Sequence, residues 1–369
     1  MGLSMTERRG ARILALATEA WGGRGGIAQS TRDLLATLGE MPQVSGIDIL
    51  PRFQQEPLQK LPTGISQYPA RSGKLVYARR ALWLSAVQRP DIVYCGHAFM
   101  APLAHLAARA AGARLVLHVH GLEVWEPLSR SIQRGLVASD LVLCVSRHTA
   151  GAVAKAAGAD PDRCAVIYNT VDNRFVPGDR VTARARFGLT PEALVLSTVS
   201  RLDPSQLHKG HDRVIPLLAE LARDLPGLTY LIAGTGGDRE RLEALACETG
   251  AADRVRFLGF VSDADLPDLY RATDLYVMPS HGEGFGIAFV EAMACGTPAL
   301  GLNMGGANDA LRDGELGRAV SETEFIDALK AELAAPPTDR ADLADRTRAT
   351  FGRLRFKTRL AAAMAPVLQ

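Results

Sequence analysis

Two glutamates and a run of glycines are the residues whose types and spacing could do chemistry. In the stretch 281–296, Glu283 lies just before a predicted helix and Glu291 lies inside it, eight positions on (291 − 283 = 8). Eight residues make about two helical turns, so both carboxylates can reach the same ligand. The glycines beside Glu283 let backbone N–H groups approach an anion at the helix N-terminus. The pattern suits a nucleotide-sugar site, and it equally suits a solvated helix carboxylate at Glu291 with Glu283 as a partner of the helix dipole.

Two cations follow an earlier predicted strand, 194–202. Arg201 and Lys209 could neutralise the charge of a leaving diphosphate, because arginine offers a planar fork of donors and lysine a compact charge. A lone arginine and lysine in a loop are otherwise typical of solvated surface.

Histidines mark a strand end in the first half of the chain. His118 and His120 alternate by two, so they share one face of a predicted strand, and His120 is followed by Gly121. Such a pair could bind a metal, but no further His or Asp set at a strand end completes a site. The acidic pairs Asp160/Asp162 and Asp263/Asp265 could also be metal ligands, although they read better as helix caps.

Taken in order, these motifs resemble the retaining glycosyltransferases of family 4, with their Glu-x7-Glu signature and GT-B fold. The resemblance covers most of the chain and implies catalytic roles for His120, Arg201, Lys209 and Glu283. The donor-binding residues that it implies are Gly25, Gly26, Arg201, Lys209, Gly234, Gly236, Phe260, Gly284, Phe285, Gly286, Ile287 and Glu291. Acceptor-binding residues would be Arg24, His120 and Asn169; Asn169 reads equally well as a turn cap. No metal and no other cofactor is expected.

Length and patterning favour an α/β fold of two Rossmann-like domains facing across a cleft. The chain has 369 residues, too many for one ordinary core. Helix-like segments separate the apolar runs, which predicts two parallel sheets. The predicted strands are 12–18, 46–50, 91–96, 114–120, 141–146 and 164–169 in the first half, and 194–202, 228–234, 255–260, 275–279 and 299–302 in the second. We expect an acceptor-binding domain over 1–178, a nucleotide-sugar-binding domain over 179–345, and a C-terminal helix at 346–369 crossing back to the first domain.

Composition indicates a globular protein of a reducing compartment. Apolar residues make up 47% and charged residues 22% of the chain, and its five cysteines include no C-x-x-C pair. No apolar run approaches the roughly 18 residues that span a bilayer. The expected location is cytoplasmic, including a peripheral place on the inner face of the cytoplasmic membrane.

The first half of the chain is the basic half. Residues 1–180 carry 21 Lys and Arg against 14 Asp and Glu, a net +7, whereas the whole chain carries only +2. Part of the excess lies in a predicted amphipathic helix within 71–84, where Trp83 and Tyr77 lie among cations and could contact an anionic membrane surface. The alternative is an ordinary surface helix with its Leu and Val packed inward. No nucleic-acid-binding pattern is present.

Three functions compete. The first is transfer of a hexosyl unit from a nucleotide-diphosphate sugar, of GDP-mannose or UDP-hexose type, to an acceptor hydroxyl. A lipid-linked glycan of polysaccharide biosynthesis is the expected acceptor. The second is an NAD(P)-dependent oxidoreductase, because Gly23-x-Gly25-x-x-Ala28 matches a loose dinucleotide pattern, although its loop is long for the tight turn. The third is a non-catalytic protein that binds sugar nucleotides.

Overall fold

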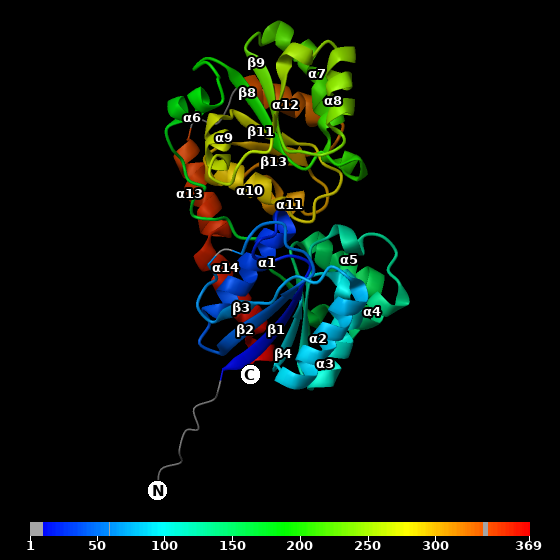
Figure 1. Cartoon of the computed structure of the whole chain (residues 1–369). Helices are drawn as coiled ribbons and strands as arrows, with labels where there is room; N and C mark the ends of the chain where they lie inside the picture. The colour runs from blue at the N-terminus through cyan, green and yellow to red at the C-terminus, as the bar shows by residue number, and fades with distance from the viewer. Residues whose placement is uncertain (1–9, 59, 335–338) are drawn as a thin grey trace. The chain divides into compact units, whose positions relative to one another are not determined.

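The computed structural model of the protein describes residues 10–58, 60–334 and 339–369 (Figure 1). These residues form two compact units. Unit 1 comprises residues up to Thr170 together with Phe356–Gln369, and unit 2 comprises Val171–Arg355. Each unit is an α/β structure built on one parallel sheet.

Unit 1 contains a seven-stranded sheet of strand order β3-β2-β1-β4-β5-β6-β7, and each neighbouring pair is parallel. Its strands are β1 (Ala11–Ala17), β2 (Val44–Pro51), β3 (Ile65–Gln67), β4 (Ile92–Cys95), β5 (Arg114–Val119), β6 (Leu141–Cys144) and β7 (Cys164–Val166). Its helices are α1 (Gly26–Gly39), α2 (Lys74–Gln88), α3 (Ala101–Ala111), α4 (Arg130–Val137), α5 (Arg147–Ala157) and α14 (Arg353–Leu368), with short 3₁₀ turns η1 (Ala98–Met100), η2 (Leu122–Val124) and η3 (Pro161–Arg163).

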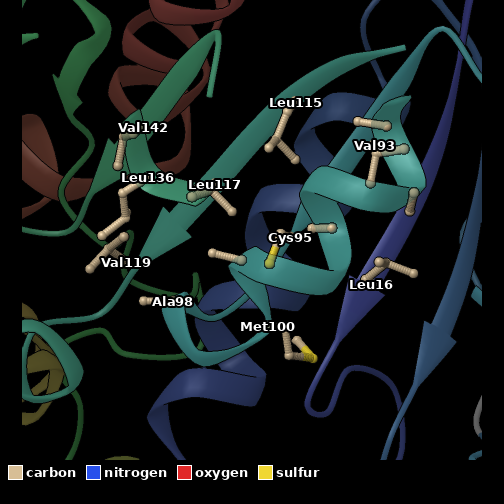
Figure 2. Close-up of a cluster of buried hydrophobic side chains, with 14 of the residues drawn as sticks. Leu16, Val93, Cys95, Ala98, Met100, Leu115, Leu117, Val119, Leu136 and Val142 are labelled. Atoms are coloured by element: carbon tan, nitrogen blue, oxygen red, sulfur yellow. The ribbon is translucent and has the colours of Figure 1, made fainter. Parts of the chain in front are cut away.

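The strands of unit 1 are apolar almost throughout because helices cover both faces of the sheet. On one face Leu16, Cys95 and Leu117 gather with Met100 in a fully buried cluster (Figure 2). The opposite face forms a second cluster, which takes in four residues of α14: Phe356, Leu360, Met364 and Val367. The last helix of the chain is therefore part of the core of unit 1.

Unit 2 contains a six-stranded sheet of order β10-β9-β8-β11-β12-β13, also parallel between neighbours. Its strands are β8 (Leu194–Val199), β9 (Leu228–Ala233), β10 (Val255–Gly259), β11 (Leu275–Met278), β12 (Ala299–Leu302) and β13 (Arg318–Val320). Its helices are α6 (Arg180–Arg186), α7 (His211–Asp224), α8 (Arg239–Glu248), α9 (Leu266–Ala272), α10 (Ile287–Ala294), α11 (Ala307–Ala310), α12 (Phe325–Ala334) and α13 (Arg340–Phe351), with 3₁₀ turns η4 (Pro204–Lys209), η5 (Ala252–Arg254) and η6 (Arg312–Gly314).

The predicted fold class of two parallel-sheet Rossmann-like units is confirmed, and all eleven predicted strands are present. The sequence predicts a first boundary at 178, whereas unit 2 begins at Val171. The reason lies in local contacts: the Val171 N–H donates to the carbonyl of Phe351, and the Phe175 ring packs against Tyr270. Of the C-terminal segment predicted to cross back, 356–369 belongs to unit 1. Within the described residues, no helix has the length and apolar character needed to cross a membrane.

The orientation predicted for Tyr77 is wrong. Its side chain is buried in unit 1, and its hydroxyl donates to the carbonyl of Leu50 at 2.9 Å. The same face of α2 also buries Ala81 and Leu84. The exposed face instead carries the apolar residues Leu75, Val76, Trp83 and Val87. The alternative prediction, a surface helix with its Leu and Val packed inward, holds for Leu82 and Leu84 but not for Leu75 and Val76.

Candidate functional site

The candidate site of unit 2 lies at the point where its strand order reverses. Strands β8 and β11 are neighbours in the sheet, and the chain leaves them toward opposite sheet edges. Ligands of open parallel sheets bind beyond the carboxyl ends of the strands at such a point. Arg201 follows β8 by two residues, and Glu283 follows β11 by five. The topology therefore brings two predicted site residues, far apart in sequence, to the same side of the sheet, beyond the carboxyl ends of β8 and β11.

Close backbone packing positions the loop that carries Arg201. A side chain at Gly234 would place its Cβ 1.7 Å from the carbonyl oxygen of Ser200, and one at Gly236 would place it 1.9 Å from that of Leu202. Both glycines have a positive φ, which other residues rarely adopt. The Leu202 N–H also donates to the Thr235 carbonyl at 2.9 Å. Gly234 and Gly236 therefore bring the loop after β9 against the loop after β8, while the Arg201 side chain stays exposed.

Lys209 and Glu283 form a largely buried ion pair. Lys209 Nζ lies 2.6 Å from Glu283 Oε1, and the two side chains are 15% and 9% exposed. The lysine ends the 3₁₀ turn η4 just before α7, and the glutamate precedes α10. The pair places one cation and one carboxylate of the predicted site in direct contact.

Glu291 accepts a hydrogen bond from a buried tyrosine of the neighbouring helix α9. The Tyr270 hydroxyl lies 2.8 Å from Glu291 Oε2. Burial, and next the charge of Glu291, raise the pKa of Tyr270 well above its usual range, so the phenol keeps its proton and acts as the donor. The Glu291 carboxylate is half-buried and is thus held by a donor that does not titrate near neutral pH.

The turn before α10 is fixed by the loop before α11 and by the end of helix α13. Gly286, with φ +95°, is the N-cap of α10, and the Gly306 N–H donates to the Glu283 carbonyl at 2.7 Å. The backbone of Gly284 lies so close that a Cβ at Gly306 would be 2.0 Å from its carbonyl oxygen. Phe285 is buried, and its ring packs edge-on against Phe351. Any contact of Phe285 with the nucleotide-sugar donor would therefore have to come from its backbone.

Two further predicted donor residues differ in exposure. Ile287, the first residue of α10, is half-buried, so part of its side chain stays accessible beside the turn. Phe260, directly after β10, is 60% exposed and offers a ring surface on which a planar base could stack.

Unit 1 gathers histidines at the ends of β4 and β5. The rings of His118 and His120 lie 4.3 Å apart, so they share one side of the strand as the alternation predicts. His120 Nε2 lies 3.0 Å from the Gly96 carbonyl, which can only accept, so this nitrogen carries the proton. The His120 backbone N–H donates to Glu123 at 2.7 Å. Burial lowers the pKa of His120. It lowers the pKa of His118, which is hydrogen-bonded to Tyr94, well below the usual value. Both rings are therefore neutral at pH 7.

The other predicted residues of unit 1 lie around helix α1. Gly25 is its N-cap and Gly26 its first residue. Arg24 is exposed and pairs with Glu56 at 2.6 Å. Asn169 is buried, and its Oδ1 accepts a hydrogen bond of 2.6 Å from Ser30, a residue of α1. Asn169 thus ties the segment after β7 to α1.

The local structure argues against a dinucleotide site in unit 1 and against metal binding by the two acidic pairs. β1 ends at Ala17 and α1 begins at Gly26, so the connection is longer than the tight turn of a dinucleotide site. Asp160 caps η3 by accepting from the Asp162 N–H. Asp265 occupies the N-cap position of α9 without a side-chain capping hydrogen bond, and its carboxylate pairs with Arg186. Among the described residues, no three His, Cys, Asp or Glu side chains gather as metal ligands would.

Several polar contacts around the site are absent from the sequence predictions. They are the contacts of Tyr270 with Glu291, of Glu123 with the His120 backbone, of Ser30 with Asn169, and a buried chain through His211. Only Glu123 had a local signal, because it follows His120 by three residues in a turn.

Solved structures share this fold over nearly the whole chain. Anabaena Alr3699/HepE in complex with UDP superposes with a TM-score of 0.76 at 22% identity, covering 96% of this chain and 100% of that one. The apo form of the lipopolysaccharide outer core galactosyltransferase WaaB gives a TM-score of 0.69 at 19% identity, covering 96% and 99%. The two parallel sheets and these likenesses define the GT-B class of fold.

Family models match both units. The model for Glycosyltransferase Family 4 matches residues 24–175, and the model for Glycosyl transferases group 1 matches residues 179–350. The chain is therefore similar to glycosyltransferase family 4 over residues 24–175 and to the group 1 glycosyl transferases over residues 179–350.

Two curated relatives are D-inositol 3-phosphate glycosyltransferases. The protein of Segniliparus rotundus is 36% identical over 250 residues, or 65% of this chain and 55% of that protein. The protein of Rhodococcus erythropolis is 36% identical over 255 residues, or 66% and 57%. The matched segment thus spans little more than half the length of these relatives.

Proposed function

We propose that this chain is a retaining glycosyltransferase that moves a hexosyl unit from a nucleotide-diphosphate sugar to an acceptor hydroxyl. The observation that carries the proposal is the cluster at the switch point of unit 2. There Lys209, Glu283 and the N-terminus of α10 lie together, with Glu291 inside that helix. The matches to the two glycosyltransferase models support the same reaction.

Unit 2 binds the donor in this proposal. Glu291 accepts hydrogen bonds from the ribose hydroxyls, and Glu283 from the transferred sugar. Arg201, Lys209 and the backbone N–H groups before α10 stabilise the negative charge that develops on the leaving diphosphate. The donor is of UDP-hexose or GDP-mannose type, and UDP-glucose appears in a solved complex of Anabaena Alr3699/HepE.

Unit 1 binds the acceptor, with His120, Arg24 and Asn169 nearest to it. The neutral His120 ring orients a sugar hydroxyl by hydrogen bonding rather than by its charge. A donor phosphate oxygen takes the acceptor proton, and no protein nucleophile or metal ion is needed. The anomeric bond to the diphosphate breaks as the bond to the acceptor oxygen forms on the same face.

The acceptor is a lipid-linked glycan at an anionic cytoplasmic leaflet. The exposed face of α2 supports this place of work, because Leu75, Trp83 and Val87 are exposed there among cations. Arg80 stacks over Trp83, with its guanidinium carbon 4.4 Å from the ring centre. A polyol phosphate is the second candidate acceptor, favoured by the names of the curated relatives.

A donor panel followed by a transfer assay tests the proposal. Thermal unfolding is measured with UDP, GDP, ADP and their hexose conjugates, because a bound ligand stabilises by RT ln(1 + [L]/Kd). The stabilising conjugate is then incubated with undecaprenyl-linked glycan or with inositol phosphate, and the anomeric configuration of the product is read by NMR. We expect one base to stabilise and the product to keep the donor's configuration. Inversion would contradict the retaining assignment, and binding without transfer to any acceptor would favour a non-catalytic protein.

A further inference from the structure

A buried chain of hydrogen bonds runs beneath the proposed diphosphate site of unit 2. Ser200 Oγ lies 2.9 Å from His211 Nε2, and His211 Nδ1 lies 3.1 Å from the Tyr230 hydroxyl. That hydroxyl lies 2.6 Å from Thr198 Oγ1, which donates to the carbonyl of Val277. Thr198, His211 and Tyr230 are buried, and Ser200 is half-buried.

This series of hydrogen bonds links three strands to one helix. Thr198 and Ser200 belong to β8 and its end, Tyr230 to β9, Val277 to β11, and His211 is the first residue of α7. Ser200 is the direct neighbour of Arg201, and His211 follows Lys209 by two residues. Arg201 and Lys209 both lie in the connection between β8 and α7, so the contact of Ser200 with the His211 imidazole joins the two ends of that connection.

The proton positions follow from the end of the chain. A carbonyl can only accept, so Thr198 donates its one hydroxyl hydrogen to the Val277 carbonyl. The Thr198 hydroxyl must therefore accept from Tyr230. Tyr230 then accepts from His211 Nδ1–H, which leaves Nε2 without a proton to accept from Ser200. Burial lowers the pKa of His211 to about 4, so the ring is neutral at pH 7 and has the one donor and one acceptor that this order needs.

We propose that His211, held as its Nδ1–H tautomer by Tyr230, is a positioning residue. It holds Arg201 and Lys209 in the relative positions that bind the diphosphate of the sugar donor. This inference rests on the proposed function for its catalytic consequence. His211 touches no reacting atom in this scheme, because its two ring nitrogens are occupied by Ser200 and Tyr230. It acts through the two ends of the connection that carries Arg201 and Lys209.

Tyr230→Phe is the test variant, because it removes one oxygen and keeps the ring in the core. Its control is Thr273→Val, which also deletes a buried hydroxyl, bonded to Ser197 and to the Leu269 carbonyl. Thr273 lies before β11, at the opposite strand end from the proposed site. Inorganic pyrophosphate is the probe, so that the first measurement needs no transfer activity.

We expect Tyr230→Phe to weaken pyrophosphate binding about 10-fold by calorimetry and to lower kcat about 10-fold, since small misplacements of charge-stabilising groups cost up to about 100-fold. The acceptor KM should stay unchanged, and Thr273→Val should match the wild type in both binding and kcat. In ¹⁵N-histidine NMR spectra of the wild type, His211 should show a protonated Nδ1 and an unprotonated Nε2.

An Nε2–H tautomer, or pyrophosphate binding by Tyr230→Phe equal to the wild type, would overturn the inference. Equal losses in Thr273→Val would also overturn it, because the effect would then be one of general stability. A wild-type protein that binds pyrophosphate but transfers no sugar would refute the proposed function alone, and the binding and tautomer results would still decide the role of His211.

Discussion

Lys209 Nζ and Glu283 Oε1 lie 2.6 Å apart, although 74 residues separate them in the chain (283 − 209 = 74). In the proposed reaction the lysine serves the leaving diphosphate and the glutamate serves the transferred sugar. Without a ligand each neutralises the other, so the site carries no unpaired buried charge from this pair. A bound diphosphate would then compete with Glu283 for the lysine, which couples donor binding to a change at the sugar-binding carboxylate.

Loss of the Arg201 cation should lower turnover much more than it lowers stability. We expect Arg201→Ala to reduce kcat about 100-fold or more, by analogy with other lost stabilisers of developing charge. Arg201 is exposed, so thermal unfolding should be close to that of the wild type.

The single variant Lys209→Ala would leave the buried Glu283 carboxylate without its cation. This should lower the free energy of unfolding by about 3–5 kcal/mol. The double variant Lys209→Gln/Glu283→Gln removes both charges together. We expect it to unfold near the wild-type temperature and to lose kcat about 100-fold or more. Full turnover in this variant or in Arg201→Ala would contradict the assigned roles.

Glu291 should control nucleotide affinity. We expect Glu291→Ala to weaken binding of the matching nucleotide by about 1–3 kcal/mol, because charge-assisted hydrogen bonds to ribose are lost. Glu291→Gln keeps an acceptor for Tyr270, so it should lose affinity with little loss of stability. Calorimetry that gave wild-type affinity for both folded variants would remove Glu291 from the site.

Stability should fall between neutral and acid pH through His211. Burial lowers the pKa of its folded form to about 4, while Asp212 and Asp238 pull it upward and Lys209 and Arg241 pull it downward. The unfolded chain takes up this proton below about pH 6.5 and the folded chain only near pH 4, so the free energy of unfolding decreases as the pH falls through that window. The slope from one such group is at most about 1.4 kcal/mol per pH unit. In urea titrations His211→Gln should show a shallower slope there; an unchanged slope would mean that the ring is already protonated in the fold.

Membrane association should depend on the exposed face of α2. We expect the wild-type protein to sediment with vesicles containing anionic phosphatidylglycerol and less so as salt rises, since each surface cation contributes about 1 kcal/mol and is screened. Arg79→Glu/Arg80→Glu should reduce recovery further. Arg109→Glu/Arg114→Glu makes the same change in net charge elsewhere on unit 1 and should not. Equal recovery on neutral and anionic vesicles would favour a soluble acceptor.

Activity should survive chelation. Asp160 caps η3, and Asp263 and Asp265 pair with Arg174 and Arg186, while the proposed site supplies Arg201 and Lys209 as cations for the leaving diphosphate. We expect initial rates in EDTA to equal those without it. Abolition by EDTA with rescue by Mn²⁺ would show that a metal ion takes part.

The parts of the fold that the sequence predicts are those written in local patterns. Strands such as β1 and β5 are nearly continuous apolar runs between turns, as expected in a parallel sheet that is covered on both faces. The edge strands β3 and β13 have three residues each, and polar or charged side chains occur in both. The equally short β7 is predicted because it begins the longer apolar run Cys164 to Tyr168. Tyr77 was misplaced because α2 has apolar residues on both its buried and its exposed face, so its pattern does not say which face is inward.

The candidate site shows the same limit at longer range. Motif order suggests that Lys209, Glu283 and Glu291 work together, but not that the first two form an ion pair or that Tyr270 holds the third. Such contacts depend on the loops that follow neighbouring strands, and no local spacing encodes them. His211 illustrates this most clearly, because a histidine after Lys209-Gly210 reads as surface until β9 brings Tyr230 beside it.

The path of the chain through the two units sets an order of completion during synthesis. Unit 1 contains both the first described residues and the last 14, while unit 2 is a contiguous insert. Because α14 supplies Phe356, Leu360, Met364 and Val367 to the core of unit 1, that core lacks one of its packed helices until α14 has been synthesised. All the described strands and helices of unit 2 before α14 are translated by then. Of the two units, the one that is begun first is thus the last that can finish folding.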